Sequence, residues 1–427
     1  MTAFAWVSVA VFLAAYTLIA TEKVHRVAAA LGGAGIMLLI HATGAEAAFF
    51  SEHSGIDWNV IFLLLGMMVI VGVLKQTGVF EYLAIWAAKR AKGRPFRLMV
   101  LLVLITAGAS ALLDNVTTVL LIAPVTFLVC ERLAVNPAPF LIAEAMASNI
   151  GGTATLVGDP PNIIIASRGG LSFNDFLIHM APMVIVLMAV FVGLCWLMFG
   201  RGFRYDPERA EEIMALDERE AIADRRLLWQ SLAVLTLVMA AFVLHPVLHY
   251  EPSVVALLGA GVLVAATKVT TEQAIAEVEW PTLVFFAGLF VLVGALVETG
   301  VIGALSKAAV AATAGQPELT TMGLLGVSAV LSAIVDNIPY VATMSPIVEQ
   351  LVQANGGHQV LWWALAFGAD LGGNATAVGA AANVVVLGIA ARNGTPISFW
   401  QFTKYGLIVT TVTVVLVAPY LWLRYLM

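Results

Sequence analysis

The sequence predicts an all-α membrane protein of two inverted repeats, each with five membrane crossings, one of them broken, and one re-entrant hairpin. Three observations predict this fold: an apolar composition, a duplicated set of motifs, and the placement of Lys and Arg. Of the 427 residues, 61% are hydrophobic and 11% are charged, against roughly 25% charged in a soluble domain. We therefore expect a lipid bilayer around the chain.

Composition also limits partners and cofactors. No basic patch interleaved with aromatic residues occurs, which argues against nucleic acid as a ligand. Cys130 and Cys195 lie in apolar stretches without a partner motif, so we expect neither a disulfide nor a metal site. We expect no cofactor other than a coupling ion, proton or sodium.

The crossings follow from apolar runs of spanning or near-spanning length. These runs occur at residues 4–20, 27–42, 58–74, 176–199, 227–244, 253–267, 281–297 and 405–423. A segment at 201–226, rich in both charge signs and without an apolar core, divides the chain. We interpret it as a solvated cytoplasmic linker between repeat one, residues 1–200, and repeat two, residues 227–427.

Internal repetition is the strongest signal. DWNVIFLLLGMMVIVGVLKQTG at 57–78 matches EWPTLVFFAGLFVLVGALVETG at 279–300. SALLDNV at 110–116 matches SAIVDNI at 332–338, and GGTATLVG at 151–158 matches GGNATAVG at 372–379. Three blocks in the same order, about 222 residues apart, indicate a duplication.

Two segments in each repeat are too short to cross comfortably, since a crossing takes around 20 residues. We expect re-entrant hairpins at 98–132 and 320–353, with Asp114-Asn115 and Asp336-Asn337 at their tips. Broken helices are expected at 139–167 and 360–391, interrupted by the two Gly-Gly blocks. Five crossings is an odd number, so the second repeat must be inverted relative to the first.

Charge placement tests this topology. With the N-terminus outside, the loops expected on the cytoplasmic side hold most of the Lys and Arg, as the positive-inside rule requires. They carry Lys23, Arg26, Lys89, Arg90, Lys92, Arg94, Arg97, Arg132, the six Arg of the linker, Lys268, Arg392 and Lys404. The external loops carry Arg168, Lys307 and Arg424. We expect a multi-pass protein of the bacterial inner membrane with both termini outside.

The helix breaks are the candidate site. Non-helical backbone at membrane depth persists only where it is buried in protein or lines a wet cavity, and half-helix ends offer N–H groups to anions and carbonyls to cations. We expect the paired glycines to supply unusual dihedrals and to let a solute approach the backbone, and Pro160-Pro161 to keep the first break open. The candidate ligands for a solute or ion are Asn115, Thr117, Thr118, Gly151, Gly152, Thr153, Thr155, Asn162, Asn337, Gly372, Gly373, Asn374, Thr376 and Asn383. The alternative for each is a helix-capping role.

Carboxylates at membrane depth are costly and mark proton relays or cation ligands. The candidate coupling residues are Asp114, Asp159, Asp336, Asp370 and Glu144. Asp114 and Asp336 correspond between the repeats, whereas Asp159 aligns with Ala380 and Asp370 with Asn149. Capping of the hairpin tips is the alternative for the first pair, and packing is the alternative for Glu144.

LLDNVTTVLLIAPVT at 112–126 and NIGGTATLVGDPPNIII at 149–165 resemble the ion transporter superfamily. This superfamily includes arsenite efflux permeases, the melanosomal P protein, NhaD-type antiporters and citrate or dicarboxylate carriers, and the DPPN block is closest to the arsenite-permease and P-protein branch. The resemblance implies an elevator mechanism, often in a homodimer, and a soluble ATPase partner for arsenite export. Dicarboxylate carriers have Ser-Asn-Thr at the hairpin tips, which Asp-Asn replaces here.

Three transport functions are open. The first is proton-coupled efflux of arsenite or antimonite, because the breaks contain Asp but no Lys or Arg to hold an anion. The second is sodium/proton antiport, and the third is sodium-coupled uptake of citrate or a dicarboxylate. An intramembrane protease is disfavoured, because there is no HExxH and LVGD at 156–159 lacks the first Gly of GxGD.

Overall fold

The computed structural model describes residues 3–21, 23–203, 205–215, 217–313, 316–354 and 356–427. Within these ranges the chain forms helices and no strands. Eight helices are long and apolar enough to cross a membrane. Two of the predicted crossings are shorter: α2 (Arg26–Leu39) has 14 residues and α15 (Pro252–Ala266) has 15.

Six of the described helices form two groups of three that pack in a similar way, and we call them the frame. α4 (Trp58–Lys75) packs against α15 and α13 (Arg225–Val243), while α17 (Trp280–Glu298) packs against α2 and α1 (Ala3–Thr21). The frame helices α4 and α17 carry the 57–78 and 279–300 repeats. Both the repeated sequence and the similar packing therefore indicate that the two halves of the frame arose from the duplication that also produced the hairpins and broken helices.

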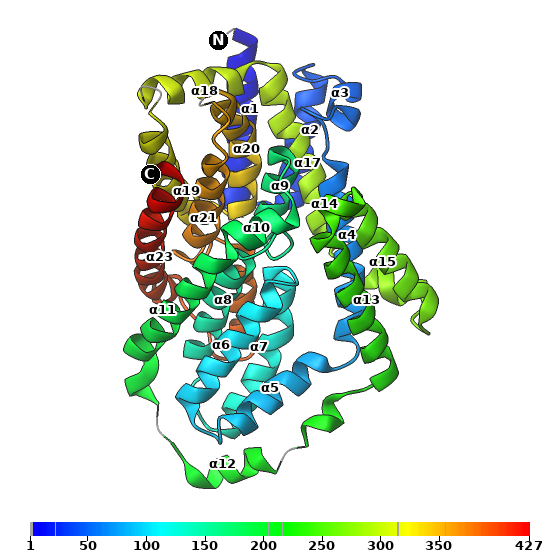
Figure 1. The fold of residues 1–427 in the computed structure, drawn as a ribbon, viewed down its shortest axis with the longest axis vertical. Coiled ribbons are helices and arrows are strands. Elements are labelled where there is room, and N and C mark those ends of the chain that lie inside the picture. Colours follow the sequence, from blue (N-terminus) through cyan, green and yellow to red (C-terminus); the bar gives the residue numbers. More distant parts are fainter. Residues whose placement is uncertain (1–2, 22, 204, 216, 314–315, 355) are drawn as a thin grey trace.

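The remaining long helices form a central body. Its hairpins are α6 (Pro95–Ser110) with α7 (Asn115–Arg132), and α19 (Pro317–Ile334) with α20 (Asn337–Ala354). Its broken helices are α8 (Ala138–Gly152) with α9 (Pro160–Gly169), and α21 (Val360–Gly372) with α22 (Ala381–Arg392). Figure 1 shows the first hairpin in the lower half of the molecule and the second in the upper half, as inverted repeats require. The predicted boundaries differ from these by at most three residues.

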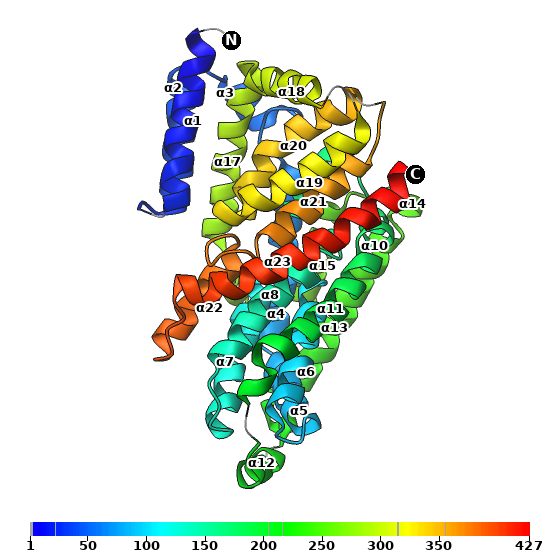
Figure 2. The same cartoon turned by 90° about the vertical axis from the view of Figure 1, so that its left-hand side faces the viewer.

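The hairpin arms are longer than expected, since α7, α19 and α20 each have 18 residues. They nevertheless turn back at buried tips, where Asn115 and Asn337 are 2% and 1% exposed. α11 (Ala181–Phe199) packs on α8, and α23 (Phe399–Leu421) on α21, which encloses the broken helices. Figure 2 shows α23 running obliquely across the body.

Two helices missed by the sequence analysis connect frame and hairpins. α5 (Val79–Arg90) and α18 (Val301–Ala312) follow Gly78 and Gly300, whose φ angles of 77° and 76° turn the chain away from α4 and α17. α5 packs on α6 and α7, and α18 on α20. The Thr-Gly pairs at 77–78 and 299–300 were the available signal for these turns.

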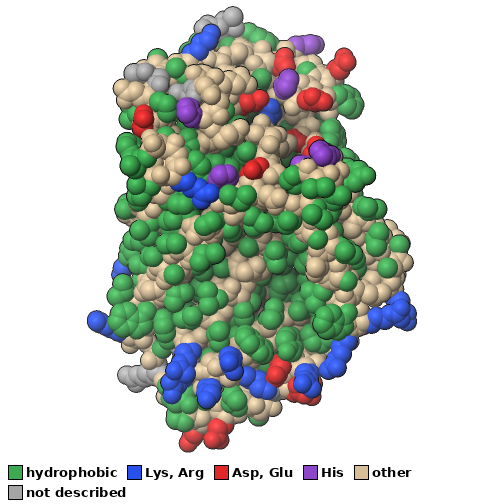
Figure 3. Space-filling model, viewed as in Figure 1, with side chains coloured by type: hydrophobic (Ala, Val, Ile, Leu, Met, Phe, Trp, Pro, Cys, Tyr) green, Lys and Arg blue, Asp and Glu red, His purple; other side chains and the backbone are tan. Residues whose placement is uncertain are grey.

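Short helices complete the fold, and most lie in connections. They are α3 (Ala45–Phe50), α10 (Phe173–His179), η1 (Gly200–Gly202), α12 (Pro207–Met214), η2 (Glu218–Ala221), α14 (His245–Leu248), α16 (Thr271–Ala276) and η3 (Trp422–Leu426). The N-terminus and C-terminus both lie on the half of the molecule away from α12 (Figure 1). Lys and Arg gather at the α12 end (Figure 3).

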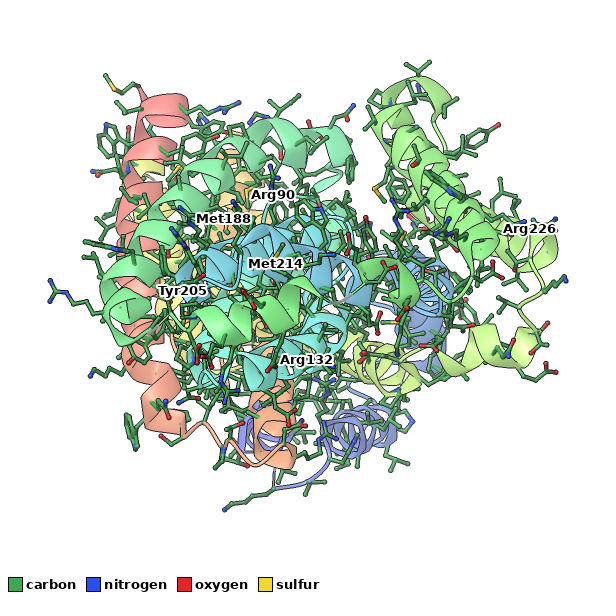
Figure 4. The ribbon with its side chains drawn as sticks, turned by 90° about the horizontal axis from the view of Figure 1, so that it is seen from below. Arg90, Arg132, Met188, Tyr205, Met214 and Arg226 are labelled. Atoms are coloured by element: carbon green, nitrogen blue, oxygen red, sulfur yellow. The ribbon has the colours of Figure 1, made fainter. Side chains whose placement is uncertain are left out.

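The linker between the repeats contains two short helices, α12 and η2. α12 is amphipathic and buries Ala210 and Ile213 against α5 and α7, and the Lys89 ammonium lies 2.5 Å from the Glu218 carboxylate. Seen from below, Met214 of α12 lies between Arg90 and Arg132 (Figure 4). One face of this short helix is apolar, although the segment as a whole has no apolar core. Arg204, one of the six linker arginines, lies outside the described residues.

The paired glycines act through close packing. Gly151, Gly152 and Gly372 are helical and Gly373 has a φ of −54°, so the expected unusual dihedrals are wrong. A Cβ on Gly151 would instead lie 2.3 Å from the carbonyl oxygen of Ala107. A Cβ on Gly372 would lie 2.6 Å from that of Ala329. Each broken helix thus contacts its own hairpin backbone directly.

We predict that Gly151→Ala and Gly372→Ala each lower the thermal stability of the purified protein. Overpacking of this kind costs about 1–3 kcal/mol, and rigid backbone cannot move aside. Gly108→Ala on α6 is the matched control, because nothing lies within 4 Å of its added Cβ. Equal melting temperatures in detergent for Gly151→Ala and Gly108→Ala would contradict the close packing.

Candidate functional site

The two helix breaks are built alike. Pro160 and Pro161 occupy the first turn of α9, where a missing N–H does no harm. Asn162 Nδ2 then donates back across the break to the carbonyls of Gly152 and Thr155, at 3.3 and 3.1 Å. In the second repeat, Asn383 Nδ2 donates to the carbonyls of Gly373 and Thr376, at 2.8 and 2.9 Å. These amides satisfy carbonyls that the interrupted helices leave free.

The predicted threonines attach the breaks to their surroundings. Thr155 and Thr376 donate to the carbonyls of Ala111 and Ala333 near the hairpin turns. Thr153 donates to the carbonyl of Asn149, at 2.8 Å, and Thr118 to that of Asp114, at 2.9 Å. Thr117 is half-buried at the tip of the first hairpin. The four bonded hydroxyls use their protons within the protein and offer only lone pairs to a guest.

Carboxamides from both repeats meet where the breaks cross. Asn115 Nδ2 donates to Asn149 Oδ1, at 3.1 Å, and to Asp159 Oδ2, at 3.0 Å. Asn149 Nδ2 donates to Asn374 Oδ1, at 2.9 Å, and to Asn383 Oδ1, at 3.1 Å. We call these five residues together with Asn337 the carboxamide cluster, and all six are at most 2% exposed.

Asp159 connects the two hairpin tips. Its Oδ2 accepts from Asn115 of the first tip and, at 3.3 Å, from Asn337 Nδ2 of the second. Asp159 itself begins α9, so a single carboxyl joins one broken helix to both hairpins. The structure therefore brings together tip residues that lie about 222 positions apart.

Asn149 is the cluster residue that the sequence analysis did not include among the candidates. It lies within α8, before the Gly-Gly pair, and so did not stand out as a break residue. Its alignment with the buried Asp370 was the available signal, because a position that carries an acid in one repeat is a site position in both.

Asp370 is fully buried, and neither of its carboxylate oxygens has a hydrogen-bond partner among the described residues. It lies close enough to Asp159 for the two carboxyls to interact electrostatically. No ion pair within the described part of the chain involves either residue. Asp159 and Asp370 are therefore two buried acids without an ion-paired basic side chain among the described residues.

Asp114 and Asp336 are half-buried and cap the hairpin tips. Asp114 Oδ1 accepts from the Thr117 N–H, at 2.8 Å, and Asp336 Oδ1 accepts from the Ile338 N–H, at 3.3 Å. These bonds match the capping alternative. Asp336 Oδ2 additionally lies 3.8 Å from the Arg26 guanidinium.

Glu144 lies outside the carboxamide cluster. It is 1% exposed between α7 and α8, and its Oε1 accepts from Thr126 Oγ1, at 2.6 Å. Its Oε2 has no partner. The structure does not bring Glu144 into contact with the other candidate acids.

Arg26 is a second residue that the sequence analysis missed as a site candidate, because it was counted only as a loop charge. It lines a cavity of about 400 Å³ between α1, α2 and the hairpin tips. Asp336, Glu279, Val116 and Ala381 also line this cavity, which leads toward the breaks. The Arg26 guanidinium donates to Thr282 Oγ1, at 3.4 Å.

No group of three or more His, Cys, Asp or Glu among the described residues could hold a metal ion. Cys130 and Cys195 are buried free thiols. What the site offers is carboxamide groups, two buried carboxyls and lone pairs of hydroxyl and carbonyl oxygen.

Known proteins are similar to this chain in sequence or in fold. An uncharacterized transporter of Mycobacterium tuberculosis is 60% identical over 98% of this chain and 98% of its own length. The human P protein is 33% identical over 94% of this chain, which corresponds to 57% of that protein. The YdaH transporter of Alcanivorax borkumensis has the same fold, with a TM-score of 0.62 at 15% identity over 99% of this chain and 98% of that chain.

The resemblance to the superfamily that contains the P protein is thereby confirmed. The family model described as "Citrate transporter" matches residues 16–368, well over half of the chain. Together with the apolar helices and the buried cluster at the helix breaks, these findings show that the chain is a multi-pass secondary transporter that belongs to the citrate transporter family, CitMHS.

Proposed function

We propose that this protein exports arsenous acid, or its antimony analogue, across the bacterial inner membrane in exchange for protons. The observation that carries the proposal is the carboxamide cluster, which combines six buried polar side chains with no basic group. Amide N–H and C=O groups can hydrogen bond a neutral trihydroxide as both donor and acceptor. Buried thiolates, which would hold arsenic(III) too tightly for release, are not among these groups.

The charges at the site favour a neutral passenger. Asp159 and Asp370 are buried without an ion pair. Two like unit charges about 4 Å apart repel by about 4 kcal/mol at an effective dielectric constant near 20. A carboxylate solute would meet this repulsion, whereas an uncharged hydroxide would not.

Asp159 is suited to couple protons to movement. As a carboxylate it accepts charge-assisted hydrogen bonds from Asn115 and Asn337, and such bonds are roughly twice as strong as neutral ones. Protonation would weaken its hold on both hairpin tips together. A proton could thereby release the tips and let the central body move against the frame, as in an elevator mechanism.

Sodium/proton antiport is a second candidate. Asp370 Oδ1, Asp370 Oδ2 and Asn162 Oδ1 are buried oxygens without donors, and oxygen atoms of this kind are ligands for hard cations. Under this alternative, sodium itself is the passenger and competes with protons for the acids.

Carboxylate uptake is a third candidate, favoured by Arg26. Its guanidinium lines the cavity below the hairpin tips, and arginine recognises carboxylates well. However, Asp336 and Glu279 line the same cavity and offset its positive charge. The family description names citrate, which keeps this candidate open to a direct test.

Flux measurements distinguish the three functions. The protein in liposomes with an internal pH dye is challenged in turn with arsenite, sodium and citrate. Proton movement driven by arsenite supports the proposal. Proton movement with sodium alone, or accumulation of citrate driven by a sodium gradient, would replace it by the second or third candidate.

We predict that Asp159→Asn lowers proton-coupled arsenite flux at least about tenfold while the protein remains folded. The amide cannot exchange a proton and so cannot switch its hold on Asn115 and Asn337. Glu212→Gln, an exposed carboxyl of the linker, is the control and should transport normally. Undiminished coupled flux in Asp159→Asn would remove Asp159 from the mechanism.

We predict that Arg26→Gln changes the KM for arsenite by less than about fivefold. The Arg26 side chain is 34% exposed, and ion pairs of this kind contribute about 0–1 kcal/mol. A carboxylate passenger would instead lose the guanidinium that lines the cavity, so transport would fall far more. Loss of arsenite transport in Arg26→Gln, with the protein still folded, would argue for an anionic substrate.

A further inference from the structure

The two repeats differ at one pair of equivalent buried positions. Asn149 in α8 and Asp370 in α21 align with each other. Asn149 Nδ2 donates to Asn374 Oδ1 and Asn383 Oδ1, at 2.9 and 3.1 Å. The residues equivalent to Asn374 and Asn383 are Thr153 and Asn162, and both of these side chains lie beside the Asp370 carboxyl. The two positions have equivalent neighbours, but Asn149 has amide protons to donate to its neighbours and the Asp370 carboxylate has none.

The groups around Asp370 have no proton left for it. The Thr153 hydroxyl donates to the Asn149 carbonyl, at 2.8 Å. Asn162 Nδ2 is occupied by the carbonyls of Gly152 and Thr155. Turning this amide over would place its oxygen against those two carbonyls, so the hydrogen bonds fix which atom faces Asp370.

Three buried oxygens consequently face each other without a donor. They are Asp370 Oδ1, Asp370 Oδ2 and Asn162 Oδ1, and both residues are 0% exposed. Thr153 Oγ1 adds free lone pairs beside them. A buried carboxylate with unpaired oxygens costs several kcal/mol, and Asp159 nearby adds negative rather than positive charge. The arrangement is stable only when a positive charge occupies it.

We propose that Asp370, Asn162 and Thr153 form the binding site for the coupling ion, a single small monovalent cation, Na⁺ or H⁺. Carboxylate, carboxamide and hydroxyl oxygens are the ligands that hard cations prefer. Asp159 already accepts hydrogen bonds from both hairpin tips, which leaves the Asp370 carboxylate as the open negative charge. The coupling role of the ion rests on the proposed transport function. Binding of the ion does not, because it can be measured without any passenger.

The same comparison predicts one ion per chain. In the equivalent place of the second break, Asn149 supplies its own amide protons to Asn374 and Asn383, so no unpaired oxygen cluster remains there. A cation would have to displace satisfied hydrogen bonds at that position. Of these two equivalent positions, that of Asp370 is the one that requires a cation.

Asp370→Asn tests the proposal, because the two side chains have nearly the same size and the substitution creates neither a cavity nor a clash. The new amide can donate to Asn162 Oδ1 as Asn149 donates to Asn383 Oδ1, so the variant should fold. We predict that NaCl, compared with choline chloride, raises the melting temperature of the purified full chain by several degrees at alkaline pH. Asp370→Asn should lose this rise and equal or exceed the sodium-free wild type in stability.

The control is Glu212→Gln, which changes an exposed carboxyl of the linker and should keep the sodium response. A pH series separates the two ions. If the proton is the only occupant, wild-type stability falls as the pH rises regardless of sodium. Asp370→Asn then makes that fall smaller, while Asp159 and Glu144 remain as buried carboxyls. Identical sodium and pH responses in the wild type and Asp370→Asn would overturn the site.

These measurements use no arsenite. Failure of arsenite flux with an intact Asp370-dependent sodium or proton response would refute the proposed passenger and keep the ion site. Arsenite flux without an Asp370-dependent sodium or proton response would support the proposed passenger and refute the ion site.

Discussion

The structure depends on one constraint: backbone unwound inside a bilayer must find its hydrogen-bond partners within the protein. Both breaks meet it with the same device, an asparagine that reaches back to two free carbonyls. Threonines then bond each break to its own hairpin. The hairpins are re-entrant for the same reason, because their tips must arrive where the broken helices end.

Close backbone contact is the second requirement of this arrangement. The Gly-Gly pairs let the broken helices approach the hairpins near Ala107 and Ala329, so the break and the hairpin of each repeat are packed directly against each other. The hairpin tips then converge on Asp159 from opposite directions. These backbone contacts and the hydrogen bonds to Asp159 hold the hairpins and broken helices of the central body together. The frame helices, in contrast, pack mainly on one another.

Much of this arrangement could be predicted from the sequence, because motifs repeated at a fixed interval locate the hairpins and breaks. Side-chain partnerships could not. Asn149 looks like an ordinary helical residue until the fold brings Asn374 and Asn383 to it. Arg26 resembles any loop charge until α2 carries it to the hairpin tips. The packing of Ile213 depends on α5 and α7, which are distant in sequence.

The duplication is broken where the buried charges lie. Asp159 has Ala380 as its counterpart and Asp370 has Asn149, so neither acid is repeated. Strict symmetry would give four buried carboxyls around one cluster, which mutual repulsion would make very costly. One acid from each repeat instead gives two carboxyls with different partners: Asp159 holds the hairpin tips, and Asp370 faces unpaired oxygens. Because the two carboxyls interact electrostatically, a cation bound at Asp370, as proposed here, would change the charge state of Asp159 and with it the hydrogen bonds to the hairpin tips.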